Sequence, residues 1–190
     1  REDKSTTPID FDSLPAADLD VPAIYENDQI SQELQLLYEG DSLSGVLGFY
    51  YLDANAFTAF DVALFTTLNG LTAQTLGDVD TETWSVFGDF SYDLTDTISV
   101  SLGGRYTKEQ TDYQARADLD TVPVFIPSLW DLTGAVKDNE WSGKLALLQK
   151  LSANHSLYYS LSRGFKAGGY NAGYATSVAQ AEDSAYAPEQ

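Results

Sequence analysis

The sequence predicts an all-β fold, in which about six long antiparallel strands form part of a transmembrane β-barrel wall. Three observations support this prediction. Apolar residues recur at every second position over long stretches. Aromatic residues make up 13% of a chain that is otherwise rich in polar residues. Compact turns alternate with long acidic connections, as short periplasmic turns alternate with long extracellular loops in such barrels.

The turn and breaker residues divide the chain into hairpins and loops. The expected organisation is an extracellular loop at 1–29, a β-hairpin at 30–57, a loop at 58–81, a hairpin at 82–112, a loop at 113–138, a hairpin at 139–170, a loop at 171–186 and the start of another strand at 187–190. The first hairpin places Leu34, Leu36 and Tyr38 on one face and turns near 39–43.

The hairpin at 82–112 has the clearest pattern. With a turn at 95–97, Phe90 is expected opposite Leu102, and Val86 opposite Tyr106, so both strands present their apolar residues to one side. Each strand runs to roughly 13 residues, or about 43 Å, whereas soluble strands have about 5 to 6 residues and a membrane strand needs about 9 to 11. Alternation alone also fits a soluble sandwich, but this length favours a membrane.

The side chains of this apolar face are expected to contact lipid. They are Val86, Phe90, Tyr92, Ile98, Val100, Leu102, Tyr106, Leu145 and Leu147. In the third hairpin, strict alternation places Arg163 on the same face. Either a β-bulge or a position near water would accommodate that charge, and the sequence leaves both open.

The charge and the residue inventory exclude several classes of function. A net charge of −19 disfavours binding to nucleic acid. One histidine and no cysteine make no zinc site, and no acidic run has the spacing of a calcium loop. No catalytic set can be assembled, so we expect neither an enzyme nor a cofactor.

Several segments resemble strands of TonB-dependent outer-membrane receptors. They are the residues at 32–34, 87–96, 103–109, 162–171 and 186–189, which read QEL, FGDFSYDLTD, GGRYTKE, SRGFKAGGYN and YAPE. The resemblance implies a 22-stranded barrel with an N-terminal plug, which imports a scarce nutrient using energy passed on by TonB. Iron chelates, cobalamin and oligosaccharides are the cargo classes it implies, and lipid, lipopolysaccharide, plug and TonB are the partners. The alternatives are a smaller barrel with an adhesive or structural role and a secreted soluble β-domain that binds glycans.

Scarce cations and their neighbours are the candidates for ligand contact. The lumen or rim residues selected are Arg105, Arg163, Lys166, Tyr170 and Asn171. A guanidinium or ammonium there would meet an anionic ligand or a lipopolysaccharide phosphate. The alternative is a structural ion pair, for example between Asp89 and Arg105.

Overall fold

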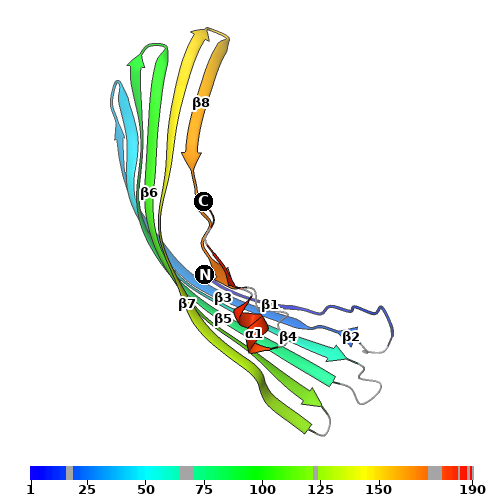
Figure 1. The fold of residues 1–190 in the computed structure, drawn as a ribbon. Helices are drawn as coiled ribbons and strands as arrows, with labels where there is room; N and C mark the ends of the chain where they lie inside the picture. The colour runs from blue at the N-terminus through cyan, green and yellow to red at the C-terminus, as the bar shows by residue number, and fades with distance from the viewer. Residues whose placement is uncertain are drawn as a thin grey trace.

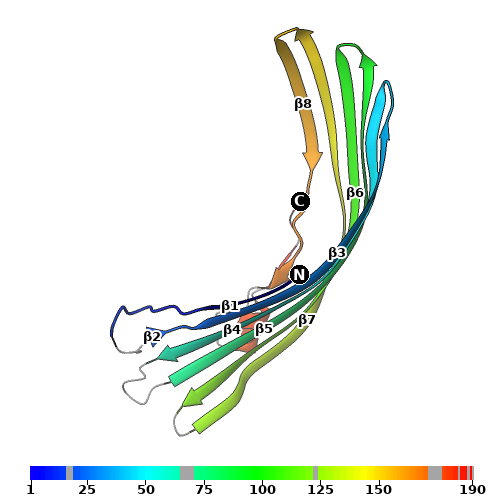
Figure 2. The same ribbon diagram turned by 180° about the vertical axis from the view of Figure 1, so that it is seen from behind.

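The computed structural model describes residues 1–15, 19–64, 71–121, 124–170, 177–183, 185–187 and 189. Most of them form one strongly curved antiparallel sheet (Figures 1 and 2). Its strands are β1 (Glu2–Thr7), β2 (Leu19–Asp20), β3 (Ala23–Glu39), β4 (Leu43–Leu64), β5 (Leu71–Thr95), β6 (Ile98–Thr121), β7 (Val124–Ser152) and β8 (His155–Arg163). The order across the sheet is β1-β3-β4-β5-β6-β7-β8, with β2 beside β4. The predicted all-β fold and its six long strands are confirmed.

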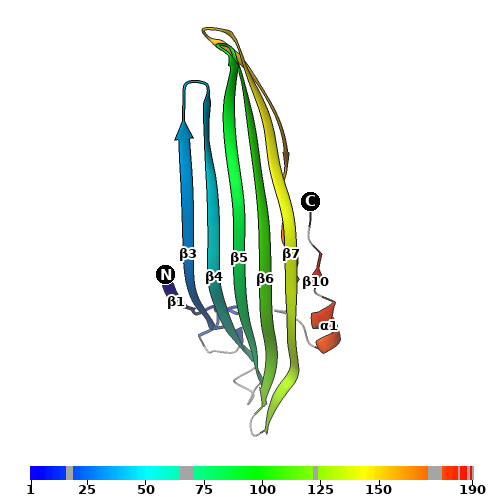
Figure 3. The same cartoon turned by 90° about the vertical axis from the view of Figure 1, so that its left-hand side faces the viewer.

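From β3 to β8, strands that follow each other in the sequence are neighbours in the sheet, as Figure 3 shows for β3 to β7. At one end the strands are joined by short turns at 40–42, 96–97 and 153–154. The predicted partners Phe90 with Leu102 and Val86 with Tyr106 are confirmed. The turn before β6 is one residue tighter than expected, because the register shifts between Asp93 and Thr95 and brings Thr95 opposite Ile98.

The other end of the sheet differs from the sequence prediction. Residues 58–64 and 71–81, expected in a loop, continue β4 and β5, and most of 113–138 continues β6 and β7. In the predicted N-terminal loop, β1 pairs with the beginning of β3. Strand β8 ends at Arg163 rather than near 170. The strands are longer than expected because their backbone ladders continue where the apolar face no longer does.

The last part of the chain lies inside the bend of the sheet (Figures 1 and 2). It contains β9 (Gly169–Tyr170) and β10 (Ala185–Tyr186), which pair with each other, and the helix α1 (Val178–Glu182). Within the predicted loop at 171–186 and the strand start at 187–190, the described residues thus include a helix and a short strand. No helix in the described ranges has the length and apolarity needed to cross a bilayer.

The two faces of the sheet have different chemistry. Thr58 and Thr111 line a cavity together with Tyr186 of β10, so their side of the sheet is the concave one. The opposite, convex face carries a continuous apolar surface near the short turns, which we call the apolar belt. The belt consists of Leu34, Leu36, Leu47, Phe49, Val86, Phe90, Tyr92, Ile98, Val100, Leu102, Tyr106, Trp141, Leu145, Leu147, Tyr159 and Leu161.

No second sheet or helix covers the belt within the described part of the chain. Leu102 is 63% exposed and Leu161 is 75% exposed. The buried hydrophobic residues are few and mostly small, with Trp130 the largest. A single sheet with its apolar face uncovered is not the arrangement of a soluble sandwich, in which two such faces pack together. All nine side chains expected to contact lipid lie on the convex face.

An aromatic row marks the end of the belt. The Tyr106 ring lies between Trp84 and Trp141, with centroids 5.7 and 4.9 Å away. Lys108 lies opposite Trp84, and the next pair on the convex face is Glu82 with Gln110. Beyond that row the convex face is polar, and the less polar side chains lie on the concave face. The chemistry of the two faces therefore reverses at this level.

Candidate functional site

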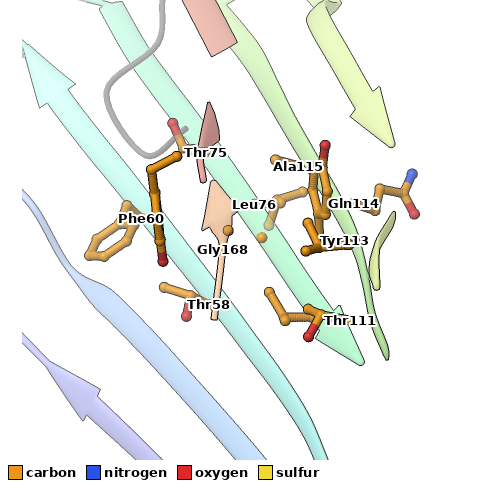
Figure 4. A pocket seen from close by; sticks show the side chains of 14 residues that line it. Thr58, Phe60, Thr75, Leu76, Thr111, Tyr113, Gln114, Ala115 and Gly168 are labelled. Atoms are coloured by element: carbon orange, nitrogen blue, oxygen red, sulfur yellow. The ribbon is translucent and has the colours of Figure 1, made fainter. Parts of the chain in front are cut away.

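A cavity of about 360 Å³ lies on the concave face, beyond the level of the aromatic row (Figure 4). Its wall comes from β4, β5, β6 and β7, and its remaining side from the C-terminal segment. The lining residues are Thr58, Phe60, Thr75, Leu76, Gly77, Val79, Thr111, Tyr113, Gln114, Ala115, Val136, Gly168, Gly169 and Tyr186.

Three contacts hold the C-terminal segment against the sheet and against itself. The Gly168 N–H donates to Asp138 Oδ2 of β7 at 3.1 Å. Lys166 and Glu189 exchange two backbone hydrogen bonds of 2.9 and 3.0 Å. The Lys166 ammonium lies 5.4 Å from the centroid of the Tyr186 ring. Tyr186 is thus held at the cavity although it is remote in sequence from the strands.

Two glycines shape the wall of the cavity. A Cβ on Gly134 would overlap the hydroxyl of Tyr113, so the Tyr113 ring lies flat along the sheet only because Gly134 has no side chain. A Cβ on Gly77 would meet nothing within 4 Å, so that position leaves open volume. A sheet surface with one side chain lying flat and one missing is hollowed, which is what a small-molecule site requires.

The described residues that line the cavity include no carboxylate, guanidinium or ammonium group, although the chain has 29 acidic and 10 basic residues. Threonine hydroxyls and two phenols supply hydrogen-bonding groups, and Phe60, Val79 and Val136 supply apolar surface. Among the described residues, no three His, Cys, Asp or Glu side chains are grouped to hold a metal. The cavity is therefore suited to binding an uncharged group by apolar contact and hydrogen bonds.

The three cations selected from the sequence do not lie in one site. Lys166 lies beside the cavity, stacked on Tyr186. Arg105 lies on the concave face at the level of the belt, and Arg163 lies at the sheet edge nearby. Tyr170 belongs to β9 by its backbone, and nothing is described of its side chain. Asn171 lies outside the described residues.

Arg105 does not make the expected pair with Asp89. Its guanidinium lies over the rings of Tyr50 and Phe87, at 5.4 and 5.5 Å, and its Nε donates to Thr107 Oγ1 at 3.3 Å. Within the described ranges no ion pair joins it to Asp89. Phe87, not Asp89, is the residue directly opposite Arg105 in the ladder.

The two sequence alternatives for Arg163 are decided by the register. The bulge in this hairpin lies between Lys150 and Ser152, so Arg163 keeps strict alternation and sits opposite Gly143 in a belt row. Its guanidinium is 3.9 Å from the Glu140 carboxylate, which belongs to the concave face. Because β8 is the edge strand and Arg163 is its last residue, the long side chain reaches around the edge.

The cavity was not predicted, because most of its lining residues lie in segments that the sequence predicts to be loops. A signal was present in β6, where Thr111, Tyr113 and Ala115 alternate with more polar residues. Its phase is opposite to that of the belt, in which Leu102 and Tyr106 are the apolar members. A prediction that assumes one apolar face along the whole strand therefore ends the strand at the point where the apolar residues change to the other face.

Comparison with known families matches the chain to a model described as TonB dependent receptor-like, β-barrel, over residues 4–190. The chain belongs to this family. Its fold is similar to that of a solved structure, the ferric yersiniabactin uptake receptor FyuA from Yersinia pestis, with a TM-score of 0.69 and 21% identity. That match covers 83% of this chain and 24% of the receptor, so the chain spans about a quarter of the length of its relative. A comparison with curated proteins gave no match.

Proposed function

We propose that this chain is part of the wall of an outer-membrane TonB-dependent receptor that imports a scarce small molecule by ligand binding and gated passage. The single observation that carries the proposal, beside family membership, is the uncovered apolar belt. A sheet that exposes such a surface along its whole width, with an aromatic row at its border, has the outer surface of a membrane barrel. This surface also argues against a secreted soluble β-domain, and membership of the receptor family argues against a small adhesive barrel.

The proposal orients the sheet in the membrane. The short turns at 40–42, 96–97 and 153–154 face the periplasm, and the strand ends beyond the aromatic row project outside the cell. The concave face then lines the lumen of the barrel. A plug domain from elsewhere in the receptor occupies this lumen, and TonB acts on the plug domain. The belt residues contact lipid, and the polar convex surface above them contacts lipopolysaccharide.

The cavity is the part of this wall that we assign to cargo. It lies on the lumenal face in the extracellular half, where an incoming molecule arrives first. Its uncharged lining favours a neutral portion of the cargo, such as a ring or sugar hydroxyls, over an ionised one. Iron chelates, cobalamin and oligosaccharides all offer such a portion, and FyuA is itself a receptor for an iron chelate.

Uptake by the full-length receptor tests the proposal. Cells that produce the receptor are supplied with iron chelates, cobalamin and oligosaccharides, with and without a functional TonB. We expect accumulation of one class only in cells with TonB. TonB-independent accumulation, or no accumulation of any class, would contradict the assignment.

Two neighbouring substitutions test the cavity. Val136→Trp fills the cavity, whereas Ala135→Trp places the same ring on the convex face of the same strand at the same height. We expect Val136→Trp to weaken cargo binding about tenfold or more, a loss of about 1.4 kcal/mol, and Ala135→Trp to leave it unchanged. If the two variants bind cargo with equal affinity, the cavity is not part of the cargo site. The assignment of the chain to a receptor would still stand.

A further inference from the structure

A second hollow lies on the concave face at the level of the apolar belt, separate from the cavity. It is an open depression of about 280 Å³ between β5, β6 and β7, and we call it the cationic depression. Its lining residues are Phe87, Gly88, Asp89, Gly103, Gly104, Arg105, Ser142, Gly143, Lys144 and Arg163. Three of the chain's ten basic residues therefore meet in one place.

The floor of the depression depends on two glycines. A Cβ on Gly48 would overlap Phe87 Cζ, and a Cβ on Gly103 would lie 2.7 Å from an Asp89 carboxylate oxygen. Both side chains therefore lie across a neighbouring glycine, flat against the sheet, and leave the space above them open. This is a built surface rather than a chance gap between long side chains.

Arg105 is held in a fixed orientation on this floor. Its guanidinium carbon lies 5.4 Å from the centroid of the Tyr50 ring and 5.5 Å from that of Phe87, and its Nε donates to Thr107 Oγ1. Within the described residues these contacts leave the terminal N–H groups at the edge of the guanidinium for a ligand. Such a pre-oriented edge matches the two oxygens of a carboxylate.

The charge in the depression is not balanced by the described residues. Arg105, Lys144 and Arg163 contribute three positive charges and Asp89 one negative charge. Glu140, 3.9 Å from Arg163, adds a second negative charge, which leaves a net of +1 in a chain with a net charge of −19. Across the described ranges neither Arg105 nor Lys144 forms an ion pair. The uncompensated charge thus centres on these two residues.

We propose that the cationic depression binds a carboxylate group, held by the Arg105 guanidinium and the Lys144 ammonium. A carboxylate fits because its two oxygens match the paired N–H groups at the edge of the guanidinium, while the Lys144 ammonium adds a second positive charge. The carboxylate comes from a dissolved organic acid or from an acidic side chain in another part of the receptor. The proposal goes beyond the uptake role, since it concerns a different part of the lumenal face and holds for any cargo.

Thiol chemistry in the full-length receptor tests the local charge. Ser142 lines the depression, and Ser142→Cys gives a reactive reporter in a segment that has no cysteine. Its reaction rates are measured with two methanethiosulfonates of opposite charge, the sulfonatoethyl and trimethylammonioethyl reagents. Ser101→Cys, on the same face but outside the depression, is the matched control. We expect the anionic reagent to be favoured about tenfold at position 142 relative to the control.

A double substitution and a competitor identify the source of the carboxylate. Arg105→Gln with Lys144→Gln should abolish the preference for the anionic reagent. If the site takes dissolved acids, citrate should slow the reaction more than sodium chloride of equal ionic strength. If an acidic side chain of the receptor fills the site, the thiol introduced by Ser142→Cys should resist both reagents until the double substitution opens it. Equal rates for the two reagents, or a blocked thiol that the double substitution does not open, would overturn the proposal.

Discussion

The proposed position of the belt in the membrane makes a quantitative prediction for one substitution, Leu102→Arg. From Leu94 to Trp84 the convex face of β5 covers ten residues, about 33 Å along the strand and about 25 Å vertically at a tilt of about 40°. That height equals the apolar band of an outer-membrane barrel, about 25 Å. Leu102 lies four residues from the aromatic row, about 10 Å vertically, and hence close to the middle of the bilayer.

An arginine near the midplane lowers the stability of a membrane barrel by about 2–4 kcal/mol, and one near the interface by about 0–1 kcal/mol. We therefore expect Leu102→Arg to lower the free energy of unfolding of the full receptor by about 2–4 kcal/mol. The control is Gln110→Arg, on the same strand and the same face but beyond the aromatic row, which should cost less than about 1 kcal/mol. Urea unfolding in phospholipid vesicles, followed by tryptophan fluorescence, measures both. Equal losses at the two positions would refute the placement of the belt in lipid.

Two further predictions concern packing within the sheet. Gly48→Ala should destabilise the receptor by about 1–3 kcal/mol, because the added Cβ would overlap the Phe87 ring. The control is Gly104→Ala, whose Cβ would have no atom within 4 Å and which should change stability by less than about 0.5 kcal/mol. The fraction of receptor that migrates as the folded form in unheated gels would show this difference, and equal fractions would contradict it. Tyr106→Ala should cost about 1–3 kcal/mol through two lost ring contacts, and Tyr106→Phe, which keeps them, should cost less than half as much. A phenylalanine variant as unstable as the alanine variant in urea would show that the rings are not the cause.

The sequence predicts well the half of the sheet that carries the apolar belt. The alternation that includes Val86, Phe90 and Leu102 predicts the strands, their faces and their register together. All three follow from one requirement, that the apolar residues of neighbouring strands lie on the same face of the sheet. The pairs Phe90 with Leu102 and Val86 with Tyr106 follow directly from that requirement. Turn chemistry then places the ends of the hairpins to within a residue.

The extensions beyond the aromatic row are not predicted, because no single face is apolar there. Asp78 and Asp80 suggest a solvated loop, yet both lie in β5, and Asn55 of β4 donates to their carboxylates at 2.7 and 2.9 Å. The ladder is continued by backbone hydrogen bonds and cross-strand polar contacts, which leave little trace in a hydrophobicity pattern. The cavity is harder still to predict, since Tyr186 reaches it only through the return of the C-terminal segment.

The exchange of apolar and polar faces along one strand has a consequence for assembly. If β6 slipped by one residue against β5, Leu102 would turn toward water, and Tyr113 would at the same time leave its place over Gly134. Both halves of the hairpin would be mismatched together, so no partial alignment would satisfy one half at the expense of the other. The reversal of the two faces at the aromatic row thus disfavours a one-residue error in the register of β6 against β5.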